Sequence, residues 1–161
     1  MKFNQLMKYT SLLLVGLLAG NSFAFVLGMG SAMKKLSASS YVAFHESMQR
    51  SFLSWTPMLC VLLIFALFSL LVTMRKRWKE LEFYLVLLAL VCVLDELFMT
   101  WTGNYPLNKV ASVGWGDIRT QWLHFMYWRC ALLIVGFGLL LASVFTKRSV
   151  SPISRDVAAA F

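Results

Sequence analysis

Four apolar runs, each about twenty residues long, dominate this chain and limit what it can fold into. They cover residues 10–29, 53–74, 81–101 and 123–144. At about 1.5 Å of rise per residue, a helix of this length crosses the roughly 30 Å hydrocarbon core of a bilayer. The runs lack the alternation of apolar and polar residues that is typical of strands. We therefore predict four transmembrane helices.

The predicted helices form one all-α domain, residues 1–148, followed by a tail at residues 149–161. Short connections make consecutive helices antiparallel neighbours, which predicts an up-down-up-down bundle. The first run also has features of a signal peptide, because Lys2 and Lys8 precede it and Ser22-Phe23-Ala24 is a weak cleavage-like triplet. Apolar residues continue as far as Met29, so we expect this run to be retained as a span.

The net charge of +8 is distributed around the ends of the predicted spans, which argues against a nucleic-acid partner. The densest basic cluster, from Arg75 to Lys79, fills the shortest connection. Cytoplasmic loops are rich in Lys and Arg, and this rule is most reliable for short loops. It places this turn, both termini and the tail in the cytoplasm. We predict an integral protein of the bacterial inner membrane whose partner is the bilayer; the sequence leaves the oligomeric state open.

The two predicted outer connections differ in character. Residues 30–54 contain Ser37 and the serines after it, a typical helix N-cap region, followed by apolar and polar residues at helical spacing. We expect an amphipathic helix before the second span, which Pro57 kinks or restarts. Residues 102–121 contain several Gly, Asn and Pro residues, which predicts turns and irregular structure.

Three charged residues inside the predicted spans are the strongest indication of function. Asp95 and Glu96 lie in the third run and Arg129 in the fourth, each about six residues from the outer end. A charge in hydrocarbon costs several kcal/mol, so it persists where it is paired, hydrated or functional. Antiparallel neighbours place Arg129 level with both acids, and we predict an ion pair with one of them. The two acids point about 100° apart, so the other faces elsewhere.

Further polar and aromatic residues gather toward the same outer end of the predicted bundle. This is how a pocket among membrane helices is expected to look, although span ends are generally more polar. The chain has no His-x3-His or Glu-x2-His pair, so ligand spacing does not support a metal site, and no cofactor is predicted. The residues concerned are Asn21, His45, Asn104, Asn108, Trp122, His124, Tyr127 and Trp128.

Three features in order give the chain a family resemblance. Phe23-Ala24-Phe25 continues the first span, and residues 44–50 form a hydrophilic segment that leads to Pro57. Pro106-Leu107-Asn108 then follows the third span, and Trp122 precedes Arg129 by seven residues. The chain resembles the anthrone oxygenase-like family of small four-helix membrane proteins, most of whose members have no assigned function. The family often has a histidine or another polar residue three positions before the arginine.

This chain departs from that pattern, because Met126 occupies the position and His124 lies two residues earlier. Two residues turn a helix by about 200°, so a role for this histidine is not carried over. The transfer to Asn108, Trp122 and Arg129 is better supported.

The resemblance implies oxidation of a lipophilic aromatic molecule, an anthrone methylene becoming a quinone carbonyl with O2 and no obligatory organic cofactor. A base removes the methylene proton, and donors stabilise the oxyanion that develops. His45, Glu46, Asp95 and Glu96 are the candidate bases, and Arg129 and Asn108 the candidate oxyanion donors. The expected substrate-binding residues are Asn21, Asn104, Trp122, Tyr127 and Trp128.

A non-enzymatic function remains the alternative: a membrane scaffold, an accessory subunit or a binder of lipophilic molecules. In that case the pair between Arg129 and its acid only holds two helices together. An enzyme requires a cavity beside Arg129, lined by His45, Asp95 or Glu96. A scaffold would show these groups fully hydrogen-bonded with no void.

Overall fold

The computed structural model describes residues 3–110 and 115–146, apart from the side chains of residues 53, 108–110 and 115. Every element in these ranges is helical. The predicted tail at residues 149–161 lies outside the described residues. In chain order the elements are α1 (Phe3–Ala24), the π-helical turn η1 (Phe25–Met29), α2 (Gly30–Lys34), α3 (Ala38–Met74), the 3-10 turn η2 (Arg75–Arg77), α4 (Leu81–Met99), the π-helical turn η3 (Thr100–Asn104), α5 (Tyr105–Val110) and α6 (Trp115–Phe145).

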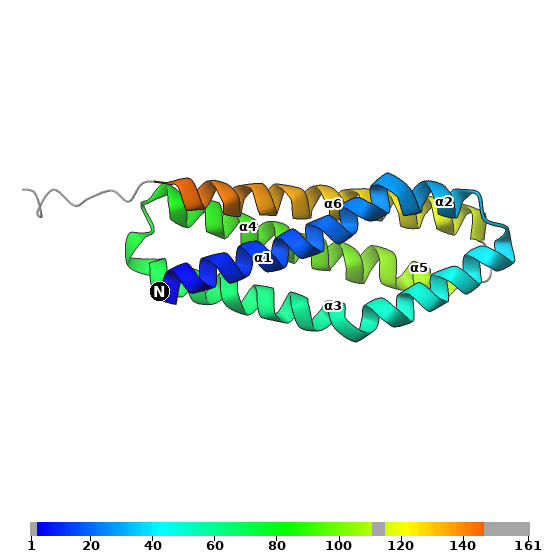
Figure 1. Ribbon diagram of the computed structural model, residues 1–161, viewed down its shortest axis with the longest axis horizontal. Helices are drawn as coiled ribbons and strands as arrows, with labels where there is room; N and C mark the ends of the chain where they lie inside the picture. Colours follow the sequence, from blue (N-terminus) through cyan, green and yellow to red (C-terminus); the bar gives the residue numbers. More distant parts are fainter. Residues whose placement is uncertain (1–2, 111–114, 147–161) are drawn as a thin grey trace, which may run out of the picture.

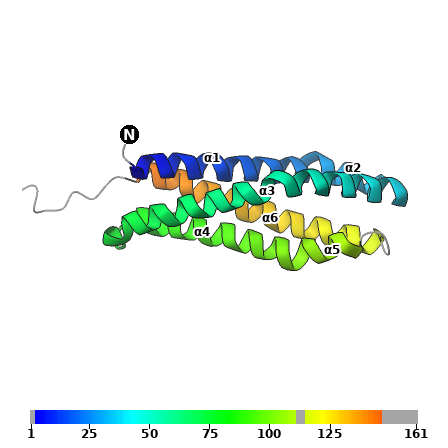
Figure 2. The ribbon, with the colours of Figure 1, turned by 90° about the horizontal axis from the view of Figure 1, so that it is seen from below.

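The described residues form long helical rods that lie side by side (Figure 1). Among the described residues, four stretches are long and apolar enough to cross a membrane: Phe3–Lys34, Ser54–Arg77, Leu81–Leu107 and Gly116–Phe145. The prediction of an all-α protein with four candidate spans is confirmed at this level. The first rod includes α1, η1 and α2, which run on in one direction when the molecule is seen from below (Figure 2).

Helix α6 packs against both α1 and α4. Gly16 and Gly30 of the first rod lie against Phe137 and Leu123, so this rod and α6 run in opposite directions. Along the other side of α6, Cys92 lies against Gly136 and Gly103 against Phe125. The N-terminus and η2 lie at one end of the rods, and α2 and α5 at the other (Figure 1). We call these the inner and outer ends.

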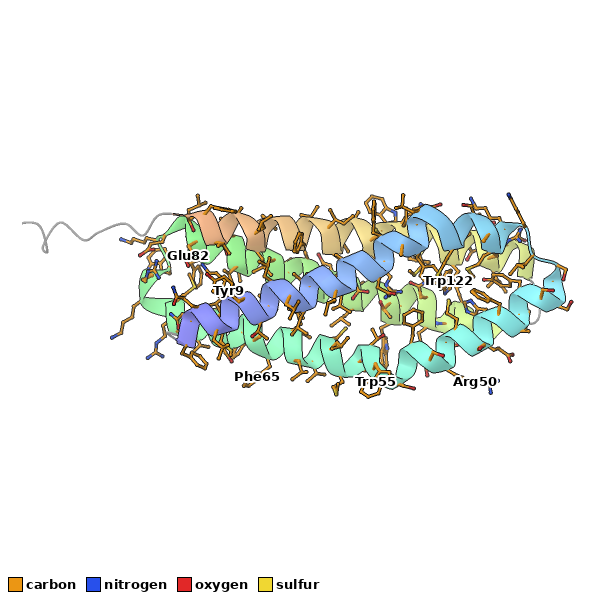
Figure 3. The ribbon with its side chains drawn as sticks, in the orientation of Figure 1. Tyr9, Arg50, Trp55, Phe65, Glu82 and Trp122 are labelled. Atoms are coloured by element: carbon orange, nitrogen blue, oxygen red, sulfur yellow. The ribbon has the colours of Figure 1, made fainter. Side chains whose placement is uncertain are left out.

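Helix α3 contains the predicted amphipathic segment. Ser37 is its N-cap, and its Oγ accepts a hydrogen bond of 3.3 Å from the backbone N–H of Ser40, as expected. Tyr41 and His45 are buried on one side of the helix, and Arg50 is exposed on the other. The helix continues without interruption through Pro57 into the second span. It bends partway along (Figure 1), and Trp55 is labelled beside the bend (Figure 3).

The prediction of irregular structure over residues 102–121 is wrong for the part that is described. The chain stays helical through η3 and α5, and α6 already begins at Trp115. Pro106 lacks the N–H that would bond back to the preceding turn, and the wider turn of η3 accommodates this. The rings of Trp101 and Tyr105 stack with centroids 5.5 Å apart and support the continuation.

Two apolar cores fill the bundle. The inner core is large and aliphatic, and the outer core is smaller and rich in aromatic residues. Leu133 belongs to the inner core and Met126 to the outer core, so Arg129 lies on α6 between them. The outer core contains Phe25, Met33, Tyr41, Trp122, Leu123 and Met126.

Gly103 makes the closest approach between η3 and α6. A Cβ atom placed there would lie 2.6 Å from the ring of Phe125. We expect Gly103→Ala to lower the free energy of unfolding by about 1–3 kcal/mol, because the ring must shift within a packed interface. Gly138→Ala is the matched control, since its Cβ would meet nothing within 4 Å. Thermal unfolding in detergent measures both; equal stability of the two variants would contradict the tight contact.

Candidate functional site

The predicted ion pair forms between Arg129 and Glu96. Nη2 and Nε of Arg129 lie 2.6 and 2.7 Å from Oε1 of Glu96. The exposed fractions of the two side chains are only 16% and 5%. The prediction of a pair between α6 and α4 is confirmed, and Glu96 is the acid that forms it.

The remaining nitrogen of Arg129 also has partners. Nη1 donates to Oδ1 of Asn104 at 3.2 Å and contacts Sδ of Met126 at 3.2 Å. Asn104 in turn donates from Nδ2 to the backbone carbonyl of Trp122 at 3.2 Å. Thr100 donates from its hydroxyl to Oε1 of Glu96 at 3.1 Å. Since Thr100 and Asn104 begin and end η3, the π-helical turn supplies two of the groups that surround the ion pair.

His45 and Trp122 join this network to the outer core. The two rings meet edge to face, with centroids 5.0 Å apart. The ring of Tyr41 stacks on the ring of His45, and their centroids are 5.5 Å apart. Burial raises the pKa of the Tyr41 phenol above its usual value, and the nearby positive charge of Arg119 opposes that shift in part. The phenol is therefore neutral at physiological pH.

Five residues predicted for the site are thus brought together from α3, α4, η3 and α6: His45, Glu96, Asn104, Trp122 and Arg129. Figure 3 shows Trp122 among side chains toward the outer end of the bundle.

The other predicted residues do not join them. Asp95 is exposed because it points about 100° away from Glu96 on the same helix. Trp128 and Tyr127 are 56% and 43% exposed, because they point about 100° and 200° away from Arg129 on α6. Asn21 is also exposed. Asn108 lies in α5, and its side chain is outside the described part of the chain.

The arrangement around Arg129 is closed rather than open. Each of its three guanidinium nitrogens has a partner, and its charge is balanced by one carboxylate. A hollow beside Met126, lined also by Phe25 and Tyr127, has no space for a water molecule. These groups are therefore placed to hold α4, η3 and α6 in register. Within the ranges that the structure describes, no group of three or more His, Cys, Asp or Glu side chains is placed to hold a metal ion.

A second polar cluster, at the inner end, was not predicted from the sequence. Glu82 is buried and forms ion pairs with Lys8 and with Arg77, the latter at 2.7 Å. Lys8 also donates to the backbone carbonyl of Ser143 at 3.0 Å, and Arg77 pairs with Glu80. Figure 3 shows Glu82 and Trp122 near opposite ends of the bundle.

A cavity of about 150 Å³ adjoins this inner cluster. Asn4, Tyr9 and Thr146 are among its lining residues, with Lys8 and Glu82. The volume is below the roughly 300–1,000 Å³ typical of pockets for drug-sized ligands. The sequence did carry a signal for the cluster, because Lys8 and Glu82 are opposite charges near the inner ends of two apolar runs.

The Arg129–Glu96 pair predicts a specific pattern of stability. Glu96→Gln should lower the free energy of unfolding by about 3–5 kcal/mol, because it leaves a buried guanidinium without a counter-charge. Replacing both residues by Met should restore most of that loss. Asp95→Asn is the matched control and should leave the protomer's stability nearly unchanged. Unfolding in mixed detergent micelles measures all three; a double variant as unstable as Glu96→Gln alone would contradict the pairing.

The inner cluster predicts a smaller effect. Glu82→Gln should destabilise the fold by about 1–3 kcal/mol, since the partner side chains are 14% and 27% exposed and partly hydrated. Glu46→Gln removes the exposed pair with Arg50, whose side chains are 58% and 80% exposed, and should cost less than about 0.5 kcal/mol. Thermal unfolding at low and at high salt compares them; equal losses would argue against the buried network.

Comparison of the chain with protein-family models, with curated proteins and with solved structures gives no significant match.

Proposed function

We propose that this chain is an integral membrane protein with a structural role, as a scaffold or accessory subunit. The observation that supports this proposal best is that all three guanidinium nitrogens of Arg129 already contact protein groups, on Glu96, Asn104 and Met126. A catalytic arginine needs N–H groups that are directed at its substrate, and space beside them. Here every guanidinium nitrogen is occupied and the hollow at Met126 admits no water.

We further propose the membrane orientation that the charges favour. The chain crosses the bilayer up-down-up-down, with both termini and the basic turn η2 on the cytoplasmic side of a bacterial inner membrane. Support comes from Arg75, Lys76, Arg77 and Lys79, which fill the short connection at the inner end. The N-terminus lies at that same end of the bundle (Figure 1).

A second candidate function is the oxygenase chemistry that the family resemblance implies. The specific observation in its favour is the contact of His45 with Trp122, whose carbonyl is bonded to Asn104 of the Arg129 network. In that function His45 or Glu96 is the base that takes a proton from the aromatic substrate, and Arg129 stabilises the oxyanion. A substrate would first have to separate the aromatic side chains of the outer core.

Oxygen consumption separates the two functions. We expect the purified protein in lipid nanodiscs to consume O2 with anthrone-like phenols no faster than empty nanodiscs. Uptake well above that background would support the oxygenase if it fell at least tenfold in His45→Asn and was kept in His124→Asn. The latter is the matched control, because His124 is exposed on α6 and is the only other histidine. Such a result would overturn the structural role.

A further inference from the structure

Asp95 is a carboxyl group on the outer surface of α4, near the middle of the candidate span Leu81–Leu107. Within the described part of the chain it takes no hydrogen bond and no ion pair. The exposed residues around it on α4 are apolar, among them Leu88, Val91 and Phe98. A carboxyl group at this position faces hydrocarbon, where it is costly unless another molecule supplies a polar partner.

Asn21 is a second polar side chain in the same situation. It is exposed on α1, in the middle part of the candidate span Phe3–Lys34, and the described residues offer it no hydrogen bond. An amide in hydrocarbon also requires a partner. Asn21 and Asp95 do not satisfy each other within one protomer, because α1 and α4 pack on α6 and not substantially on each other.

The two side chains lie at the same depth. Gly16 lies against Phe137, so Asn21, five residues further along α1, is level with Leu132 of the antiparallel α6. Cys92 lies against Gly136, so Asp95, three residues further along α4, is level with Leu133. Leu132 and Leu133 are consecutive, and one residue of a helix corresponds to about 1.5 Å along its axis. Asn21 and Asp95 therefore differ in depth by only about 1.5 Å.

The surface beside Asn21 permits a close approach by another helix. Gly20, Ala24 and Gly28 follow one another at intervals of four residues on the exposed side of the first rod. A Cβ atom at Gly20 or Gly28 would meet nothing within 4 Å, so the seam is open. Small residues at this spacing let helix backbones approach closely in membranes, and polar side chains then hydrogen-bond across the contact.

We propose that a second copy of this chain occupies this surface, with α4 of one copy against α1 of the next. Asp95 of one copy accepts a hydrogen bond from the Asn21 amide of the other. Copies inserted in the same orientation keep every residue at its own depth, so the two side chains meet without any shift along the membrane normal. The association stands whether the protein is a scaffold or an enzyme.

Two different surfaces meet in this contact, so it is heterologous. Such contacts repeat from copy to copy and close into a ring, or extend as a row in the plane of the membrane. A two-fold contact made by the α4 surface alone would instead bring Asp95 next to Asp95, with no amide to donate.

Association in bilayers tests the proposal. Donor- and acceptor-labelled copies are reconstituted in phosphatidylcholine–phosphatidylglycerol vesicles, and energy transfer is followed as the protein is diluted with lipid. We expect wild-type copies to associate, and Asp95→Leu or Asn21→Leu to weaken association about three- to twentyfold, the range of single hydrogen bonds between membrane helices. Gly28→Leu should weaken it at least as much, by filling the seam.

Gly138→Leu is the matched control, because Gly138 is equally open but lies on α6, outside the proposed contact. Thr102→Val in η3 controls for polarity on the same rod as Asp95, since the Thr102 hydroxyl is already bonded to the carbonyl of Phe98 at 2.7 Å. Both variants should associate like the wild type. Monomeric wild-type protein at every dilution, or weakening by Gly138→Leu and not by Gly28→Leu, would overturn the proposal.

Cross-linking tests the contact without altering Asp95 or Asn21. Phe98 is 62% exposed and lies one turn beyond Asp95, so a benzophenone amino acid in its place should react with residues near Ala24 of a differently tagged copy. Mass spectrometry of the cross-linked peptides identifies the partner segment. Cross-links to α4 or α6 of the second copy, or none between copies, would refute the α1–α4 contact even if a variant above failed to fold.

Discussion

The bond between Arg129 and Glu96 determines how the outer half of this bundle is put together. Both side chains are almost fully buried, and a single unpaired charge at this depth would be far less stable than the pair. The pair therefore favours the alignment of α4 and α6 in which Arg129 lies level with Glu96. Asn104 and Thr100 can reach the pair because η3 widens the helix just beyond α4. The outer core then packs around a fixed arginine.

Lipid tails are as apolar as the side chains of the core, so apolar burial alone does not drive membrane helices together. Close packing and polar contacts must do so, and this protein has both. Gly16, Gly103 and Gly136 allow α6 to approach its neighbours, while ion pairs lie toward both ends of the inner core. Lys8 and Glu82 connect α1 to α4 at the inner end, where these helices otherwise pack little against each other.

Counting residues from the ends of the apolar runs predicts well how deep a residue lies in the bundle. It predicts poorly which side of its helix the residue faces. Depth was enough to place Arg129 level with Asp95 and Glu96, and the structure confirms a pair at that level. The choice of Glu96 depends on how α4 is rotated against α6, which packing along the whole interface determines. Asn104 faces the arginine only because of the π-helical turn, and Gly and Pro residues after α4 suggested irregular structure instead.

The same rotation that buries Glu96 leaves Asp95 on the exposed surface of α4, so the two adjacent acids have different chemical environments. Oε1 of Glu96 pairs with Arg129 and accepts a hydrogen bond from Thr100 inside the protomer, whereas Asp95 has no hydrogen bond or ion pair with the described residues. On the surface of a soluble protein water hydrates such a carboxyl group, but the hydrocarbon core of a bilayer offers no water. Polar residues that fail to join the internal network therefore say more about what the protein contacts than those that join it. In this chain Asp95 and Asn21 are those residues, and they share a depth on helices that α6 keeps apart.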